Sequence, residues 1–334
     1  MNIELFNRFL KSNFKLEVDK CVEIEQTTYI ESGKLIRRRD GKIFGIKNFI
    51  PRFVEDNSYA DSFGYQWNRF RALQHDSKNG KKYTEKRLIQ NSRWSTKQIA
   101  DKVVLECGCG PGRFTEILYK LGGIIIAVDM SNAIDVNLEN LGLHANVLYI
   151  QDDITKLYYM KLKADYVFCY GVLQHTPNPR KTLHRLGQYA NDGGKLSVDV
   201  YAKMDKPNPF YGPKYFWRPV TKRMNKEKLL EILQWYIPKY IKFDTKIRTK
   251  SIGNVPIGEY ILGIIPVPCW NYIKMGYSDT ERVQHAIMDT FDALSPEYDR
   301  PCSYKELYTW AKEENYSNFK VTYGSNGLVL NAVK

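Results

Sequence analysis

Val103-Val104-Leu105-Glu106-Cys107-Gly108-Cys109-Gly110-Pro111-Gly112-Arg113-Phe114 is the stretch that decides the fold. Its opening apolar residues predict a buried parallel strand. Gly108, Gly110 and Gly112 allow a tight turn and let a ligand approach the bare backbone. Apolar residues then recur at helical spacing from Phe114 onward. The stretch therefore predicts a strand, a turn and a helix whose first amides favour a carboxylate or a phosphate.

The glycine spacing separates two kinds of nucleotide site. Dinucleotide sites carry G-x-G-x-x-G, whereas this turn reads G-x-G-x-G. Glu106 stands at the tip of the strand, where a carboxylate suits a positively charged ligand better than a pyrophosphate. S-adenosylmethionine carries an ammonium, a sulfonium and a carboxylate, so we expect this cofactor here. A glycine turn with a purely structural role is the alternative.

Two further apolar runs predict parallel strands that end in ligand-binding residues. Ile124–Val128 is followed by Asp129, which lies 129 − 108 = 21 positions after Gly108. An acid at about this distance reaches both ribose hydroxyls of a bound nucleotide. Val147–Ile150 leads to Asp153-Ile154, where we expect the acid to accept from an adenine amino group and the isoleucine to cover the ring.

This succession of motifs resembles the class I S-adenosylmethionine-dependent methyltransferases, and more narrowly bacterial methyltransferases of surface-polysaccharide and related small-molecule pathways. The resemblance rests on Leu105–Glu116, Ala127–Ser131, Asp153-Ile154 and Gly171–Pro177, with flanking stretches at Phe63–Phe70 and Asp289–Pro296. It implies an α/β, Rossmann-like sheet of seven strands with a terminal antiparallel pair. The expected cofactor-binding residues are Glu106, Gly108, Gly110, Gly112, Arg113, Phe114, Asp129, Met130, Asp153, Ile154, Tyr170 and Gly171.

The order of patterns divides the chain into five regions. We expect a small β module at 1–58, lid helices at 59–95, the cofactor-binding core at 96–203, a large insertion after the fifth strand at 204–300, and a final helix and strand pair at 301–334. Asp40-Gly41 is a hairpin signal within the β module. Asn191–Gly194 is expected to turn into the fifth strand. Relatives often resemble a zinc ribbon in the first region, but only Cys21 remains here, so we expect no zinc.

The net charge of +13 indicates an anionic partner, and a basic solvated surface is the alternative. The insertion is basic and aromatic over 214–250 and apolar over 257–270. We expect it to lie over the carboxyl ends of the strands and close the acceptor site, with peripheral membrane contact as the alternative. Without a signal peptide or an apolar run long enough to cross a membrane, the sequence predicts a cytoplasmic protein. The cysteines are expected to be buried thiols.

The expected reaction is an in-line methyl transfer, which for a hydroxyl acceptor needs a base. His175 follows the fourth strand and is the candidate for that base; a helix-capping role is the alternative. Asp199 and Tyr201 are secondary acceptor contacts. A metal role is not expected, because Gly171 and Gln174 stand where ubiquinone-biosynthesis O-methyltransferases carry acids beside a similar histidine.

The sequence thus predicts a methyltransferase that acts on a small-molecule or sugar-linked acceptor, of anionic character if the charge serves binding, by O- or N-methylation. An RNA methyltransferase is a rival hypothesis, favoured by the charge and the interleaved aromatics. No recognisable RNA-binding module and no Asn-Pro-Pro-Tyr-like tetrapeptide accompany it. A non-catalytic cofactor-binding subunit is the second rival, although the cofactor motifs are intact.

Overall fold

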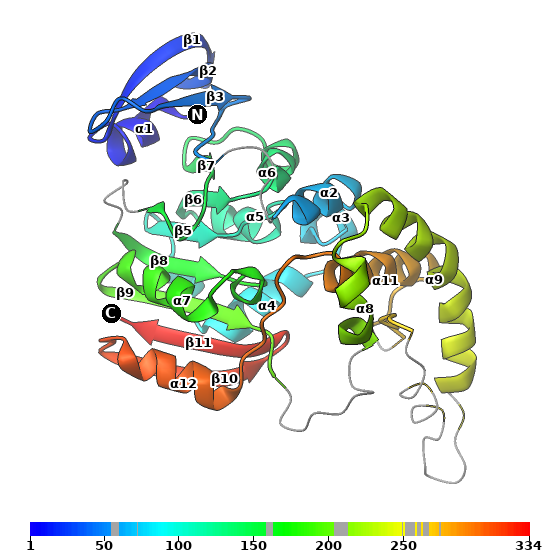
Figure 1. Cartoon of the computed structure of the whole chain (residues 1–334). Coiled ribbons are helices and arrows are strands. Elements are labelled where there is room, and N and C mark those ends of the chain that lie inside the picture. Colours follow the sequence, from blue (N-terminus) through cyan, green and yellow to red (C-terminus); the bar gives the residue numbers. More distant parts are fainter. Residues whose placement is uncertain are drawn as a thin grey trace. The chain divides into compact units, whose positions relative to one another are not determined.

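The computed structural model describes residues 1–54, 60–71, 73–157, 163–203, 213–248, 250, 258, 262, 267–273 and 275–334. Contacts divide the chain into two units (Figure 1). The first unit joins Met1–Lys203 to Tyr298–Lys334, and the second is Met204–Glu297. The expected region 204–300 has nearly the same limits as the second unit.

A seven-stranded sheet forms the centre of the first unit, in the order β7-β6-β5-β8-β9-β11-β10. Its strands are β5 (Val103–Cys107), β6 (Ile124–Asp129), β7 (Val147–Gln151), β8 (Ala164–Cys169), β9 (Ala190–Val200), β10 (Asn318–Gly324) and β11 (Gly327–Val333). The first five are parallel, and β11 runs antiparallel to both β9 and β10. This topology confirms the predicted fold class, with its terminal antiparallel pair.

Helices cover both faces of this sheet, because the central strands are apolar on both sides. One core cluster packs α7 (Pro179–Gln188) and α12 (Tyr304–Glu313) against the sheet. The other packs α4 (Tyr83–Ser92), α5 (Arg113–Lys120) and α6 (Ala133–Leu141). The loops at the carboxyl ends of the strands therefore stand on a rigid support.

The turn expected at Asn191–Gly194 lies within β9, which begins at Ala190. The pairing of β9 with β8 jumps from Ala190 to Lys195, and Gly193 has φ +76°, so these four residues bulge out of the ladder. The amide of Gly193 donates to the carbonyl of Lys334 at 3.0 Å, and the Lys334 amide donates to the Gly194 carbonyl at 3.0 Å. These two hydrogen bonds anchor a bulge at the place where Asn, Asp and Gly indicated a turn.

The N-terminal β module is confirmed as a four-stranded antiparallel sheet in the order β1-β2-β3-β4. Its strands are β1 (Phe14–Ile24), β2 (Thr27–Arg37), β3 (Ile43–Lys47) and β4 (Ile50–Pro51). The expected Asp40-Gly41 turn joins β2 to β3, with Gly41 at φ +71°. One short helix, α1 (Ile3–Phe9), was not predicted from the sequence pattern. Asn2 caps its N-terminus, because the Asn2 side chain accepts hydrogen bonds from two backbone amides.

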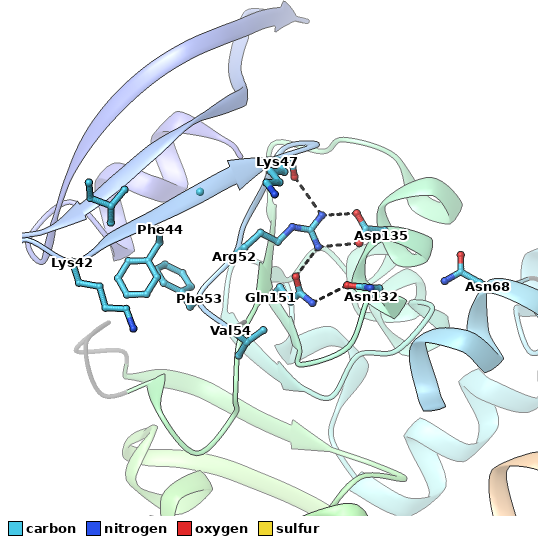
Figure 2. A pocket seen from close by; sticks show the side chains of 12 residues that line it. Lys42, Phe44, Lys47, Arg52, Phe53, Val54, Asn68, Asn132, Asp135 and Gln151 are labelled. Atoms are coloured by element: carbon cyan, nitrogen blue, oxygen red, sulfur yellow. Dashed lines mark hydrogen bonds and ion pairs between the residues drawn. The ribbon is translucent and has the colours of Figure 1, made fainter. Parts of the chain in front are cut away.

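The segment after β4 covers the outer edge of β7. Arg52 forms a parallel bridge with Gln151, and the Phe53 amide donates to the Gln151 carbonyl at 2.9 Å. Arg52 also holds Asp135 on α6, with its Nη2 atom 2.5 Å from Oδ1 of the acid (Figure 2). The N-terminal module is therefore fastened to the edge of the main sheet by backbone and side-chain contacts.

Three helices precede the core in the region expected to form a lid: α2 (Asp61–Arg69), α3 (Asp76–Asn79) and α4. Tyr59, where the expected lid starts, lies outside the described residues. Close backbone approach fixes α2 over the sheet. A Cβ atom added to Gly64 would lie 3.2 Å from the amide nitrogen of Asn132, which stands at the start of α6.

The second unit is built from α8 (Pro213–Thr221), α9 (Lys226–Arg248) and α11 (Asp279–Leu294). Helix α11 begins with a capping box between Ser278 and Glu281. Most of the apolar stretch 257–270 lies outside the described residues. Among the described helices of the whole chain, none combines the length and the apolar character needed to cross a membrane.

Candidate functional site

The glycine turn between β5 and α5 has the open backbone that the sequence predicts. Gly108, Gly110 and Gly112 have φ values of +78°, +52° and +94°, which favour glycine. Their neighbours are also close. A Cβ atom on Gly112 would lie 2.0 Å from the Asn137 side chain, and one on Gly108 would lie 2.3 Å from Val172. The turn is therefore a cradle that only glycine can form.

Asp129 at the end of β6 fixes this turn. Its Oδ2 atom accepts from the Gly110 amide at 2.8 Å, and its Oδ1 atom accepts from the amide and hydroxyl of Ser131. Burial raises the pKa of the Asp129 carboxyl above its ordinary value. A carboxylate offers about four acceptor positions, so one remains for a ligand. The ribose role stays a prediction.

Glu106 is buried at the tip of β5 and is only partly satisfied. Its Oε2 atom accepts from the hydroxyl of Thr115 on α5 at 2.7 Å. Its Oε1 atom has no hydrogen-bond partner among the described residues. Burial raises the pKa of Glu106 to about 8. A cationic ligand group would both satisfy this oxygen and lower that pKa.

Arg113, Phe114 and Met130 are three further residues of the predicted cofactor set. Arg113 opens α5, and its guanidinium lies 4.7 Å from the Phe114 ring centre and donates to the Gln74 side chain. Phe114 is buried against Phe168 in the core. Met130 is partly exposed, and its carbonyl accepts from Gln151.

Asp153 and Ile154 follow β7, as the sequence predicts. The Asp153 Oδ1 atom accepts from the amide and hydroxyl of Thr155, and Oδ2 pairs with Lys156 at 3.1 Å. Ile154 is buried, and its carbonyl accepts from Tyr189. The acid is therefore held in place by its own loop, and its role toward adenine stays a prediction.

The ends of β8 and β9 meet at Asp199, which is fully buried. Its Oδ1 atom accepts from the Gly171 amide at 2.5 Å, and its Oδ2 atom lies 2.5 Å from Nη2 of Arg87 on α4. Gly171 has φ +75°. Tyr170, the residue before it, exchanges a hydrogen bond with Ser197 at 2.7 Å. Asp199, expected to contact the acceptor, thus holds the turn after β8.

Arg87 is a residue that the sequence analysis did not identify. Its guanidinium lies over the rings of Phe114 and Tyr170, at 5.6 and 5.7 Å from their centres. Its Nε–H is buried without an acceptor among the described residues. A buried donor of this kind favours an anionic ligand group nearby. The sequence gave little indication that Arg87 belongs to the site, because its partner Asp199 is 112 residues away.

His175 lies in the short turn Leu173–His175 and is buried. Its Nδ1 atom is 2.9 Å from the carbonyl of Tyr298, and a carbonyl can only accept, so Nδ1 carries the proton. In the neutral ring Nε2 then has a free lone pair, and this buried atom has no partner among the described residues. The rings of Phe63 and Tyr201 contact the imidazole edge-to-face at 5.0 and 5.5 Å.

Helix α2 connects these features. Phe63 contacts His175, and Trp67 on the next turn lies close to Gly110, with a Cβ atom there 3.5 Å from the indole Nε1. Gln66 is buried, and both of its amide atoms lack partners among the described residues. Asn68 and Arg69, two further polar residues of α2, are exposed. Of these three, Gln66 is therefore the one enclosed and available to a ligand.

The side chains of the site give no support for a bound metal ion. No group of three His, Cys, Asp or Glu side chains that could hold a metal ion occurs among the described residues. Gly171 and Gln174 supply no carboxylate beside His175.

Of the six cysteines, Cys107, Cys109, Cys169 and Cys302 are buried, Cys269 is half-buried and Cys21 is exposed, so the expectation of buried thiols is wrong for Cys21.

Three basic residues of the second unit, Arg218, Lys222 and Arg223, lie in the stretch 214–250 that was expected to serve the acceptor. Arg218 instead is buried and donates to the carbonyls of Ala293 and Pro296. Lys222 pairs with Glu297 at 3.2 Å, and Arg223 is exposed. Arg218 therefore holds α8 to the end of α11, and a role in acceptor binding is left to Lys222 and Arg223.

The sheet order, the glycine cradle and the acids at the ends of β5 and β6 agree with what the resemblance to class I, S-adenosylmethionine-dependent methyltransferases implies. Comparison with protein families agrees, since residues 81–242 match a family model described as a methyltransferase domain. The fold class expected from the sequence is confirmed, and the family match supports the expected resemblance over residues 81–242.

Curated proteins that are similar to this chain include ubiquinone biosynthesis O-methyltransferases. The protein of that name from Coxiella burnetii is 35% identical over 100 residues, which cover 29% of this chain and 43% of the relative. The one from Azotobacter vinelandii is 26% identical over 188 residues, or 54% of this chain and 75% of the relative. The chain thus spans less than half the length of the first of these relatives.

Solved methyltransferase structures are more distant. Magnesium protoporphyrin IX methyltransferase from Synechocystis PCC 6803, crystallised with S-adenosylhomocysteine, is 13% identical with a TM-score of 0.43. The alignment covers 83% of this chain and 96% of that structure.

Proposed function

We propose that the protein transfers the methyl group of S-adenosylmethionine to a hydroxyl of a small-molecule acceptor. The observation that carries the proposal is the state of His175, whose Nδ1–H is fixed on the Tyr298 carbonyl and whose Nε2 lone pair is buried and free among the described residues. Val172 of the same turn lies against Gly108, so the imidazole belongs to a turn that adjoins the cofactor cradle. Such a nitrogen can accept the proton of a hydroxyl.

The cradle residues suit the cofactor. The free oxygen of Glu106 would face a cationic group, and the buried Nε–H of Arg87 would face the carboxylate. Asp129 would use its remaining acceptor position for the ribose. When bound, S-adenosylmethionine supplies an electrophilic methyl group on its sulfonium. The relatives named as O-methyltransferases support a hydroxyl acceptor, whereas nothing specifically supports a surface-polysaccharide role.

The second unit is proposed to select the acceptor. It follows β9 directly, so its chain leaves the sheet at the edge where open α/β sheets bind ligands. Its basic character over 214–250 matches an acceptor with an anionic or sugar-like part better than a bare hydrocarbon.

Calorimetry with S-adenosylmethionine, S-adenosylhomocysteine and NAD tests the cofactor assignment. We expect binding of the first two and none of NAD. A screen of hydroxylated small molecules with radiolabelled methyl donor then tests the reaction. Tight NAD binding without the other two ligands would refute the cofactor, and methyl transfer exclusively to RNA would refute the acceptor class.

A further inference from the structure

Helix α9 has two faces of different character. One face is buried and apolar, and within the second unit the helix packs against α11 (Figure 1). The apolar residues of this face are Leu229, Leu230, Leu233, Ile237 and Ile241. Burial of this face explains how α9 is held in its own unit. The opposite face has a composition that this packing does not explain, because the outward face of such a helix is ordinarily polar.

An exposed stripe follows that opposite face along most of the helix. Each of its members lies three or four residues from another member, a spacing that places all of them on one side of an α-helix. The members are large apolar side chains interspersed with lysines. All of them are exposed, and they are Lys228, Ile232, Trp235, Lys239, Lys242, Phe243 and Lys246. We refer to these residues as the α9 stripe.

The apolar members of the α9 stripe are strongly exposed. Trp235 is 68% exposed, Phe243 is 47% exposed and Ile232 is 40% exposed. Single exposed apolar residues are common on soluble proteins, whereas several in line on one helix face indicate a surface that meets another apolar phase. Tryptophan and phenylalanine beside lysines are typical of helices that lie in a membrane interface.

The charge of the α9 stripe is positive. Lys239 and Lys242 have no carboxylate partner among the described residues. After Glu231, which borders the stripe near its start, the one acid of α9 is Asp244. Asp244 is buried and pairs with Arg248 at 2.9 Å, so it does not offset the exposed lysines. Such a face is complementary in charge to the phosphates of lipid headgroups.

The arrangement of these side chains favours a lipid surface over RNA. The Lys239 ammonium lies over the Trp235 ring, 4.1 Å from its centre, and so occupies one face of the indole. Base stacking needs an open ring face, and Ile232 has no ring to offer. In a membrane interface the same pair is well placed, because the indole can enter the apolar boundary while the ammonium stays among the headgroups.

We propose that the α9 stripe lies on the surface of an anionic lipid bilayer, with the axis of α9 parallel to the membrane plane. Ile232, Trp235 and Phe243 enter the boundary between headgroups and acyl chains, and the lysines contact lipid phosphates. The proposal narrows the membrane contact that the sequence raised for the insertion to one face of one helix. The stripe contains neither Lys222 nor Arg223, so the proposal does not depend on the acceptor assignment or on methyl transfer.

Flotation of the full chain with lipid vesicles tests the proposal. We expect binding to vesicles of phosphatidylcholine mixed with phosphatidylglycerol, and binding to phosphatidylcholine alone that is at least about tenfold weaker. Added salt should weaken the binding to the mixed vesicles, because it screens the lysine charges. Tryptophan emission should shift to the blue when the mixed vesicles are added. Trp235→Phe keeps a ring at this position and should lose most of that shift while it still binds.

A first pair of double variants tests the aromatic part of the α9 stripe. Trp235→Gln, Phe243→Gln should weaken binding to the mixed vesicles at least about tenfold. The matched control is Tyr308→Gln, Tyr323→Gln, which removes two exposed rings from α12 and β10 and should bind like the unchanged chain. Circular dichroism spectra and Tm values show whether both proteins are folded.

A second pair tests the charge. Lys239→Gln, Lys242→Gln should weaken binding to the mixed vesicles at least about tenfold and reduce its salt dependence. The matched control, Lys305→Gln, Lys312→Gln, removes the same charge from exposed positions of α12 and should have little effect.

The proposal fails if the mixed vesicles are not bound, if phosphatidylcholine alone is bound as tightly, or if the α9 variants bind like their controls. A blue shift that persists in full in Trp235→Phe would also place the membrane contact elsewhere. Retention of RNA on a filter that falls in the α9 variants, with vesicle binding unchanged, would assign the stripe to RNA instead.

Discussion

The Nδ1 atom of His175 lies 2.9 Å from the carbonyl oxygen of Tyr298, a residue 123 positions further along the chain. Tyr298 is the first residue of the first unit after the second unit ends. The returning chain therefore sets the proton position on the imidazole. The amide of Arg300 adds a further link to the same turn by donating to the Gln174 carbonyl at 2.8 Å.

Replacing this imidazole tests its proposed role as base. His175→Ala should lower kcat by about 10²- to 10⁴-fold, the usual contribution of a general base. Affinity for S-adenosylhomocysteine should change by less than about twofold, as measured by calorimetry. His184→Ala removes an exposed histidine from α7 and serves as the control. Full turnover by the His175 variant would assign this histidine a structural role.

The raised pKa of Glu106 predicts a pH dependence of cofactor affinity. Between neutral pH and the pKa of about 8 the buried carboxyl is mostly protonated, and a cationic ligand favours its ionised form. Affinity for S-adenosylmethionine should therefore rise from pH 7 to pH 9. Glu106→Gln should bind more weakly and lose this rise. Parallel pH profiles in both proteins would contradict the assignment.

The same carboxyl affects the stability of the ligand-free protein. Its folded-state pKa of about 8 exceeds the ordinary value of 4.5, so between these values the folded state holds more protons than the unfolded state. Stability from this group is full below about pH 4.5 and falls as pH rises toward 8. The Tm should therefore decline less over this range in Glu106→Gln, as seen by calorimetric melting. An equal decline would show that the pKa is not raised.

Asp129→Ala should weaken S-adenosylhomocysteine binding by about 1–3 kcal/mol, the usual cost of stranding hydrogen-bonded groups. The structure gives two causes, because this acid would hold the ribose and already holds the Gly110 amide. Ser131→Ala loses one support of the carboxylate but keeps the ribose acceptor, so its effect should be smaller. Unchanged affinity in a folded Asp129 variant would show that the ribose assignment is wrong.

The second unit should govern acceptor turnover and leave cofactor affinity unchanged. Lys222→Ala, Arg223→Ala should lower acceptor kcat/KM by about 10- to 100-fold, if these cations make charge-assisted contacts of about 1.5–3 kcal/mol. The control, Lys305→Ala, Lys312→Ala, removes equal charge from α12. Arg218 is unsuitable because its loss would strand two buried carbonyls. Equal turnover by both double variants would move the acceptor contacts elsewhere.

Local patterns were sufficient for the frame of the fold and for the cofactor cradle. Short apolar runs in the sequence indicate buried parallel strands. Positive φ values at Gly108 and Gly112 are expected because a tight turn requires them. Features that depend on distant residues were not accessible. The pairing of Arg87 with Asp199 spans 112 residues, and Gly193 and Gly194 are hydrogen-bonded to the distant Lys334.

The cover on the edge of β7 has a consequence for how copies of this chain meet. An uncovered edge strand offers free backbone groups to any other strand, and is a common start of aggregation. Arg52 and Phe53 occupy those groups at Gln151, which leaves β10 as the sheet's other edge. The N-terminal module thus hinders strands of other molecules from pairing with this edge of the sheet. Removal of the N-terminal module should therefore cause self-association of the chain, even if the glycine cradle still binds its ligand.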